Sequence, residues 1–314
     1  VADFRQLKTK YPYITMLPQV DFLNFITNEA KKYPNFQLVM GARAEKLIEE
    51  NGEVKGVHYR GQDGRYEIRA LLTVAADGRF SRIRRLAHFE PIKTSPPMDI
   101  LWFKLPRNPG EPDQAFGRFG VGHIIAIINR FDIWQVGYII PKGGYQQVRA
   151  EGLEKLRQSV VELAPELTEN IEHLQEWKQV SVLSVESNRL PRWYKPGLLL
   201  IGDAAHVMSP VGGVGINYAI MDAVVAANIL TGPLKAGHIQ LSDLAKVQRK
   251  RELPTRIIQM FQAFVQNQVL AKALKSNKPF TLPPITRFLL SIPGLRTLPA
   301  RIVAFGLWPA HVKA

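Results

Sequence analysis

The chain has 314 residues, and its 41 Lys and Arg against 27 Asp and Glu give a formal net charge of +14. Hydrophobic residues make up 46% of it, which suffices for a buried core and excludes a disordered chain. Because there is no cysteine, disulfides, Cys-ligated metals and thiol catalysis are excluded. The sequence shows no secretory segment, no apolar run of spanning length and no H-E-x-x-H zinc motif. We therefore expect a soluble, cytoplasmic protein with more than one structural lobe and no metal site.

The N-terminal part predicts a helix and then short strands. The stretch Tyr13–Tyr33 places Pro18 in a first helical turn and has apolar residues at helical spacing after it. Strands are expected at 36–39, 44–49 and 54–59, with an Asn51-Gly52 turn between the last two. The apolar run Leu71–Ala76 predicts a buried strand that ends at Asp77.

The middle of the chain predicts a separate antiparallel lobe. Strands are expected at 100–105, 114–119, 124–129 and 134–141, then a helix at 148–163 and a returning strand at 180–190. The aromatic residues of this lobe either line a pocket or pack within the sheet, and we expect packing for each of them taken singly. They are Phe103, Phe116, Phe119, Trp134 and Tyr138.

The most informative stretch is Leu198–Leu230. Four apolar residues predict a buried strand, Gly202-Asp203 ends it, a glycine-rich loop follows, and an Ala-rich helix begins at Ile216. A carboxylate accepts hydrogen bonds from hydroxyls, glycines let backbone approach a ligand, and a helix N-terminus offers free N–H groups. This pattern predicts a site for a ligand with hydroxyls and an anionic or electron-rich ring.

Two motifs carry a family resemblance. The string GDAAHVMSPVGGVGIN, from Gly202, resembles the GD motif of class A FAD-dependent monooxygenases, the para-hydroxybenzoate hydroxylase-like family. The string DGRFSR, from Asp77, resembles the DG motif of the same family. The resemblance implies an α/β fold with a Rossmann-like FAD-binding domain (1–92 and 183–236), an inserted antiparallel-sheet substrate domain (93–182) and a helical, basic C-terminal tail (237–314).

The resemblance also implies site residues. The Asp203 carboxylate would bond the ribityl chain of FAD, and Asp77 would lie near its pyrophosphate and the path of the nicotinamide cofactor. The remaining flavin-side residues it implies are Gln19, Arg43, Ala44, Pro210, Gly212, Gly215, Ile216 and Asn217. It identifies no catalytic acid or base.

Several polar residues near these motifs have a structural interpretation. We expect His206 and Asn228 to be structural, and Asp222 to matter less to the flavin than Asp203. We expect Arg84 and Arg85 to lie on a solvated helix face; Arg82 is left open between that face and the site.

The family's opening strand, G-x-G-x-x-G turn and helix have no counterpart near the N-terminus, so we expect an incomplete, truncated FAD-binding unit. The implied function is a hydroxylase that uses NAD(P)H and dioxygen on an aromatic, polyketide-like or quinone-type substrate. Two alternatives stay open. One is a flavin-dependent reductase or dehydrogenase acting on a lipid-like substrate, and the other is an inactive fragment unable to hold FAD.

The C-terminal quarter is strongly basic. Residues 235–314 contain thirteen Lys and Arg but only two Asp and Glu, and apolar stretches such as Phe288–Leu290 and Ile302–Trp308 interrupt them. This combination predicts either peripheral attachment to an anionic membrane, at the inner membrane face, or a helical cap packed on the FAD domain. No nucleic-acid-binding module is recognisable, so nucleic acid is not an expected partner.

Overall fold

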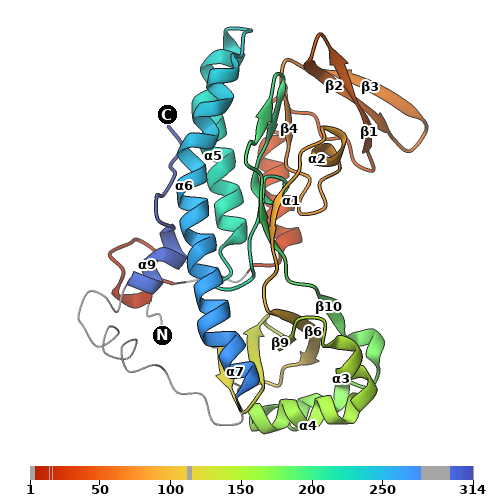
Figure 1. Cartoon of the computed structure of the whole chain (residues 1–314), viewed down its shortest axis with the longest axis vertical. Helices are drawn as coiled ribbons and strands as arrows, with labels where there is room; N and C mark the ends of the chain where they lie inside the picture. The colour runs from red at the N-terminus through yellow and green to blue at the C-terminus, as the bar shows by residue number, and fades with distance from the viewer. Residues whose placement is uncertain (1–3, 14, 16, 112–114, 277–297, 314) are drawn as a thin grey trace.

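The computed structural model describes residues 4–13, 15, 17–111, 115–276 and 298–313. The molecule has two parts, seen one above the other in Figure 1. The upper part holds three small sheets beside two long helices, and the lower part holds one antiparallel sheet with helices beneath it. This is the mixed α/β arrangement predicted from the sequence, with an antiparallel sheet inserted between two segments of the upper part.

The first sheet of the upper part is antiparallel. It contains β1 (Arg43–Glu50), β2 (Glu53–Arg60) and β3 (Arg65–Arg69) in that order. The β1–β2 turn is the predicted one, because Asn51 and Gly52 both have positive φ, at 52° and 77°. That geometry matches the twist of a two-residue hairpin.

The second sheet carries the core of the upper part. In it, β13 (Leu198–Leu200) pairs in parallel with β4 (Thr73–Ala75) and antiparallel with β12 (Tyr194–Lys195). All three leucines of β13 are fully buried, each contributing ~1.5–3 kcal/mol relative to an exposed side chain. A third small sheet joins β5 (Ile92–Thr94), β11 (Ser187–Arg189) and β14 (His206–Val207).

The lower part is a five-stranded antiparallel sheet. Its strands, in spatial order, are β10 (Ser181–Leu183), β6 (Met98–Pro106), β9 (Ile133–Pro141), β8 (Ile124–Asn129) and β7 (Phe116–Phe119). Helices α3 (Tyr145–Glu151) and α4 (Leu153–Leu163) accompany it, with 3-10 turns at Pro165–Leu167, Asn170–His173 and Trp177–Gln179. The side chains of Phe103, Trp134 and Tyr138 are buried in one cluster with α4. Packing within the sheet is confirmed for Phe103 and Trp134, whereas Tyr138 packs there and also lines a hollow.

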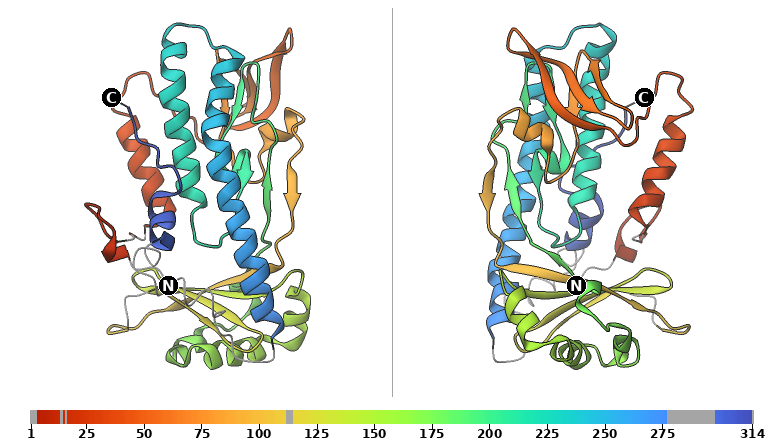
Figure 2. Two further views of the ribbon diagram at one scale, coloured as in Figure 1. Left: turned by 60° about the vertical axis from the view of Figure 1, so that its left-hand side comes forward. Right: turned by 90° about the vertical axis from the view of Figure 1, so that its right-hand side faces the viewer.

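The two long helices lie side by side and run the height of the upper part (Figures 1 and 2). They are α5 (Gly215–Lys235) and α6 (Leu241–Val265). A π-helical turn, Gln266–Leu270, joins α6 to α7 (Ala271–Lys275), whose Ala273 and Leu274 pack on the lower sheet. The short α9 (Leu298–Phe305) packs Ile302 and Val303 against the α5 side of the upper part.

The shorter helical elements are η1 (Phe4–Gln6), α1 (Gln19–Ala30), α2 (Arg82–Leu86) and the 3-10 turn η5 (Gly202–Ala204). The apolar face predicted for α1 is present but not covered: Leu23 is 52% exposed and Phe25 is 61% exposed. Figure 2 shows α1 at the edge of the molecule. No helix within the described ranges is long and apolar enough to cross a membrane.

Three predicted elements are wrong in detail. Residues 36–39 form no strand, because β1 pairs only with β2 and no strand of the described residues pairs with this segment. The helix predicted at 148–163 is two helices, because Gly152 has φ 93° and ends the first of them. The strand predicted at 180–190 is two strands, β10 and β11, which belong to different sheets.

Candidate functional site at the ends of two parallel strands

The two motifs meet at one edge of a sheet. Strands β4 and β13 are parallel, with Ala75 opposite Leu200, so the segments that follow both strands leave the sheet at the same end. Two residues after Ala75 comes Asp77, and three after Leu200 comes Asp203. Ligand sites in open α/β sheets lie at these carboxyl ends. The sheet therefore brings both predicted acidic residues to one edge.

Arg84 joins the two motifs directly. Its side chain is buried, and its guanidinium donates to the backbone carbonyls of Asp203 (3.3 Å), Ala204 (3.0 Å) and Arg79 (2.6 Å). The prediction that Arg84 lies on a solvated helix face is wrong, because its side chain is buried and supplies the donor that these backbone carbonyls need. Its neighbour Arg85 is exposed, as predicted.

The carboxylate of Asp77 organises the start of α2. It accepts from the Ser81 hydroxyl at 2.5 Å and from the backbone N–H groups of Arg82 (2.7 Å) and Ile83 (3.0 Å). The Ser81 hydroxyl in turn accepts from the N–H of Arg84, as an N-cap does. Asp77 thus holds the loop that places Arg84, and its own oxygens already have internal donors.

Asp203 differs from Asp77, because it is partly buried. From Ile201 through Ser209, it is the one residue that is not buried. The structure shows no hydrogen bond to its carboxylate within the described ranges, whereas its backbone carbonyl accepts from Arg84. Burial raises the pKa of Asp203, and the nearby Arg79, His206 and Arg84 partly offset that rise. A half-buried acceptor without a protein donor is suited to a ligand hydroxyl.

The opposite side of the same turn rests on Asp222. This carboxylate, fully buried on α5, accepts from the Gly202 N–H at 2.9 Å and lies 2.6 Å from the Nε2 atom of His206. It also accepts from the Nε atom of Arg251 on α6 at 2.7 Å. Despite its burial, its contacts with His206 and Arg251 hold the pKa of Asp222 below its usual range. The turn is therefore fixed between Arg84 at its carbonyls and Asp222 at its N–H.

Gly202 is required by this geometry. Its φ is +58°, and an added Cβ would lie 2.9 Å from the Cβ atom of Ala219 on α5. Glycine is the residue that adopts this backbone conformation without strain and lets α5 approach so closely. The hydrogen bond between His206 and Asp222 agrees with the structural role predicted for His206.

The loop that follows leaves room beside the turn. Gly212 and Gly213 are exposed with φ of +81° and +63°, and nothing lies within 4 Å of a Cβ added at Gly213. The loop ends at Gly215, where α5 begins without a side-chain cap. The first N–H groups of a 21-residue helix are thus available to a ligand. Pro210, Ile216 and Asn217 lie on this stretch and are not fully buried.

The other predicted site residues lie on separate elements. Gln19 is exposed at the start of α1, Arg43 is exposed at the start of β1, and Ala44 packs against the core beneath that strand. Within the described residues, the structure shows no hydrogen bond between these three and the Asp203 turn. Their predicted flavin contacts stay predictions.

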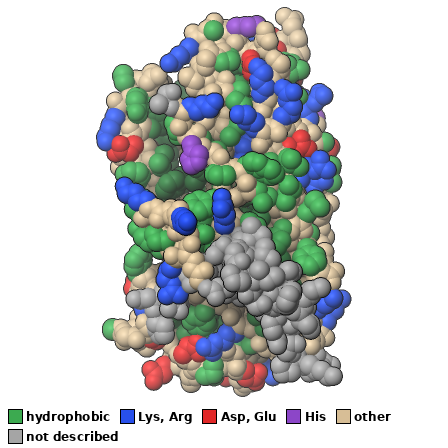
Figure 3. Space-filling model, turned by 90° about the vertical axis from the view of Figure 1, so that its left-hand side faces the viewer, with side chains coloured by type: hydrophobic (Ala, Val, Ile, Leu, Met, Phe, Trp, Pro, Cys, Tyr) green, Lys and Arg blue, Asp and Glu red, His purple; other side chains and the backbone are tan. Residues whose placement is uncertain are grey.

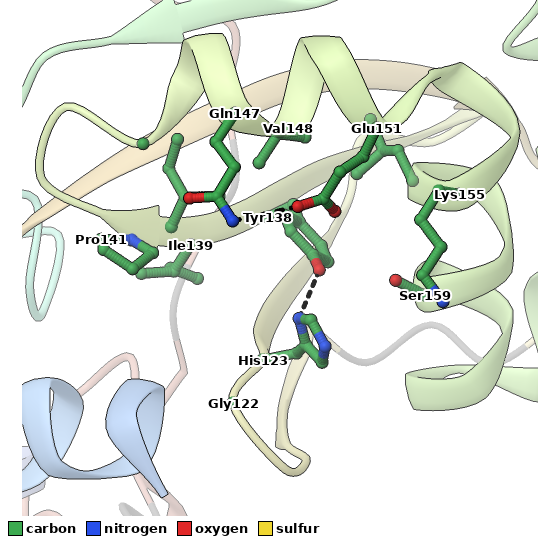
Figure 4. A pocket seen from close by; sticks show the side chains of 13 residues that line it. Gly122, His123, Tyr138, Ile139, Pro141, Gln147, Val148, Glu151, Lys155 and Ser159 are labelled. Atoms are coloured by element: carbon green, nitrogen blue, oxygen red, sulfur yellow. Dashed lines mark hydrogen bonds between the residues drawn. The ribbon is translucent and has the colours of Figure 1, made fainter.

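A separate hollow of about 220 Å³ lies in the lower part, between the end of β9 and helices α3 and α4 (Figure 4). In it the Tyr138 hydroxyl lies 2.6 Å from the Nδ1 atom of His123, and burial raises the pKa of Tyr138 to about 12. Ser159 and Lys155 of α4 face the same hollow. Its place on the α3 and α4 side puts it away from the turn at Asp203.

Open helix N–H groups, a glycine loop and an unpartnered carboxylate fit a flavin with its ribityl hydroxyls, and comparison with known proteins agrees. The family model described as FAD binding domain matches residues 1–259. The chain belongs to this family, and its two motifs place it among the class A FAD-dependent monooxygenases. FAD is the cofactor of that family.

Among curated proteins, the chain is 33% identical over 257 residues to 6-methylpretetramide 4-monooxygenase of Streptomyces rimosus, covering 81% of this chain and 61% of that protein. It is 27% identical to digeranylgeranylglycerophospholipid reductase 1 of Methanopyrus kandleri, covering 67% of this chain and 56% of that protein. The chain thus spans less than two thirds of the length of either relative. Among solved structures, OxyS anhydrotetracycline hydroxylase from Streptomyces rimosus has the same fold, with a TM-score of 0.69 and 21% identity. That match covers 97% of this chain and 60% of the other.

Proposed function

We propose that this protein is the FAD-dependent part of a monooxygenase that hydroxylates an organic small molecule with NAD(P)H and dioxygen. The observation that carries the proposal is Asp203: a single accessible carboxylate in a buried run, at the shared end of two parallel strands and before an uncapped helix. An aromatic, polyketide-like or quinone-type substrate is favoured, since the relative with 33% identity is named as a monooxygenase of a pretetramide.

In this proposal the residues at the carboxyl ends of β4 and β13 have different roles in binding FAD. Asp203 accepts hydrogen bonds from the ribityl hydroxyls, and the backbone at Gly212 and Gly215 and the start of α5 donate to the electron-rich end of the ring. When bound, FAD supplies the redox and oxygen-transfer chemistry. Arg84 and Asp222 hold the turn rigid, so that Asp203 needs no reorganisation on binding.

The remaining predicted assignments belong to the proposal as well. Asp77, Gln19, Arg43 and Ala44 complete the flavin surface, with Pro210, Ile216 and Asn217 on the loop. Residues 1–92 and 183–236 would form the FAD-binding domain and 93–182 the substrate domain, with 237–314 following as the basic C-terminal segment. The five-stranded sheet would then cover the flavin site.

The test is a coupled assay on the flavin-loaded protein with NADH and NADPH, offering planar phenolic polyketides and quinone precursors. We expect nicotinamide oxidation that is stimulated by substrate, consumes dioxygen and yields a product heavier by one oxygen atom. Reduction of a double bond in a prenyl lipid, at an equal rate without dioxygen, would contradict the hydroxylase and support the reductase. A protein that takes up no FAD would contradict both.

We also propose reversible attachment to an anionic membrane surface through the basic C-terminal segment. Its support is the charge of residues 235–314, thirteen cations against two acids. The apolar stretch Phe288–Leu290 lies outside the described residues. The stretch Ile302–Trp308 is partly used within the fold, because Ile302 and Val303 pack on the upper part and Asn228 binds the backbone of His311 and Lys313. These contacts support the helical-cap interpretation for that end of the segment and a structural role for Asn228.

A further inference from the structure

A stripe of apolar side chains on α6 is exposed. Leu253, Met260, Phe261 and Phe264 recur at helical spacing on the outer face and are 54%, 70%, 47% and 62% exposed. The inner face of the same helix is buried, with Arg251 and Gln259 inside the fold. A helix that already packs one face in the core therefore carries a second apolar face outward.

Cations bracket this stripe at both ends. On the outer face before it lie Lys246, Arg249 and Lys250, and after it come Lys272 and Lys275 on the following turns, all exposed. The nearby acids already pair with cations: Asp243 with Lys246 at 2.9 Å, and Glu252 with Arg256 at 3.9 Å. From Leu253 to the last residue the sequence contains no Asp or Glu.

Figure 3 shows the side of the molecule that faces left in Figure 1, with hydrophobic side chains gathered at mid-height and Lys and Arg side chains above and beside them. Apolar residues between clusters of cations are the pattern of a helix that lies in the interface of an anionic bilayer. The apolar section from Leu253 to Phe264 spans ~16 Å of helix at 1.5 Å per residue. That length suits contact along the membrane plane.

We propose that the outer face of α6 is the surface by which this protein docks on an anionic lipid bilayer. The inference rests on the membrane attachment proposed above and gives it a specific contact surface. The stripe would enter the headgroup region, the flanking cations would pair with lipid phosphates, and Arg251 would stay inside the fold. A lipid-soluble substrate would then reach the protein from the same surface.

A label at one position tests the geometry directly. Because the chain has no cysteine, Phe264→Cys offers one site for an environment-sensitive dye. We expect its emission to shift to the blue with phosphatidylglycerol–phosphatidylcholine vesicles and to stay unchanged with phosphatidylcholine alone. The matched control is Phe131→Cys, at a residue 69% exposed in the lower part. A shift at the control of the same size as at α6 would overturn the proposal.

Co-sedimentation with the same vesicles separates the outcomes. The triple variant Met260→Ser/Phe261→Ser/Phe264→Ser should pellet at least tenfold less, since it removes apolar area from the interface. Arg249→Gln/Lys250→Gln should lose ~25-fold at low salt, at about fivefold for each charge. Phe131→Ser and Lys104→Gln/Lys155→Gln, both in the lower part, should stay within about twofold of the unmodified protein.

Each contrary result has a distinct meaning. If the unmodified protein pellets and the α6 variants pellet equally, the docking surface is not α6, although membrane attachment stands. If the unmodified protein does not pellet on anionic vesicles, both membrane proposals fail, and the flavin proposal is unaffected. If the triple variant instead converts a dimer to a monomer, the stripe is an interface between copies, and the membrane surface is overturned.

Discussion

The Nε atom of Arg251 on α6 donates to the Asp222 carboxylate on α5 across 2.7 Å, and the two side chains are 2% and 0% exposed. The same carboxylate accepts from the N–H of Gly202, one residue before the proposed flavin ligand. A buried ion pair is costly to desolvate, so its retention beneath this turn indicates a positioning role.

Replacing Asp222 should destabilise the protein strongly. Asp222→Asn keeps the shape but removes the charge that Arg251 pairs with, and losing one partner of a buried pair costs ~3–5 kcal/mol. Urea denaturation measures this, with the exposed Asp132→Asn as the control, expected within about 0.5 kcal/mol. Equal midpoints for the two variants would show that the pair does not stabilise the fold.

Arg84→Met should also destabilise, by ~2–4 kcal/mol, because one buried and two partly buried backbone carbonyls lose their donor. Its neighbour provides a matched control: Arg85→Met changes the same net charge on the same helix, but at an exposed side chain. Thermal denaturation of both variants separates the loss of the Arg84 hydrogen bonds from the loss of one positive charge. Similar melting temperatures for the two variants would show that Arg84 contributes no more to stability than an exposed arginine.

Asp203 should show opposite effects on folding and on FAD. Its folded pKa is raised, so ionisation opposes folding: this carboxyl favours the folded state at low pH, and that contribution is lost as pH rises through the folded pKa. Asp203→Asn should therefore stabilise the flavin-free protein at pH 7. Asp203→Ala should weaken FAD binding ~10- to 150-fold, the value of a charged hydrogen bond of ~1.5–3 kcal/mol.

Flavin fluorescence titration measures the affinity, and the exposed Asp63→Ala is its control. Asp222 cannot serve as a neutral control, because its substitution acts on the same turn through Gly202. A loss of stability on Asp203→Asn, together with unchanged FAD affinity on Asp203→Ala, would assign Asp203 to the fold alone.

Two glycines separate backbone strain from crowding. Both Gly202 and Gly213 have positive φ, so alanine at either one costs ~1–2 kcal/mol of strain. Only at Gly202 would the new methyl group lie 2.9 Å from Ala219. We expect Gly202→Ala to destabilise the flavin-free protein by at least ~1 kcal/mol more than Gly213→Ala, measured by denaturant midpoints; equal losses would argue against close packing of α5 on the turn.

Local patterns in the sequence predicted much of the fold. The strand at 124–129 has the predicted bounds, since a run of β-branched apolar residues favours a strand wherever it pairs. The prediction of a strand at 36–39 was wrong because a strand also requires a partner strand, and a local sequence pattern does not show which segments lie side by side in space. The break at Gly152 depends on a positive φ, which glycine permits but does not require.

The candidate site divides in the same way. Motifs indicated Asp203 and its glycine loop, which lie in one stretch of sequence. The residues that hold the turn in place were not predicted, because they are distant in sequence from the groups they bind. Arg84 is 119 residues from Asp203, and Arg251 is 29 residues from Asp222. One signal was available: Asp222 is the only charged residue in the apolar run from Ile216 to Leu230, where an acid without a partner would be costly.

The buried pair also fixes the register of two helices. Sliding α6 along α5 by one turn, about 5.4 Å, would separate Arg251 from Asp222 and leave both charges unpaired in a dry interior. Apolar contacts alone tolerate such a shift far better, because they have no preferred partner. The two long helices therefore have one favourable alignment. Because Asp222 also binds the N–H of Gly202, that alignment sets the position of the Gly202 turn.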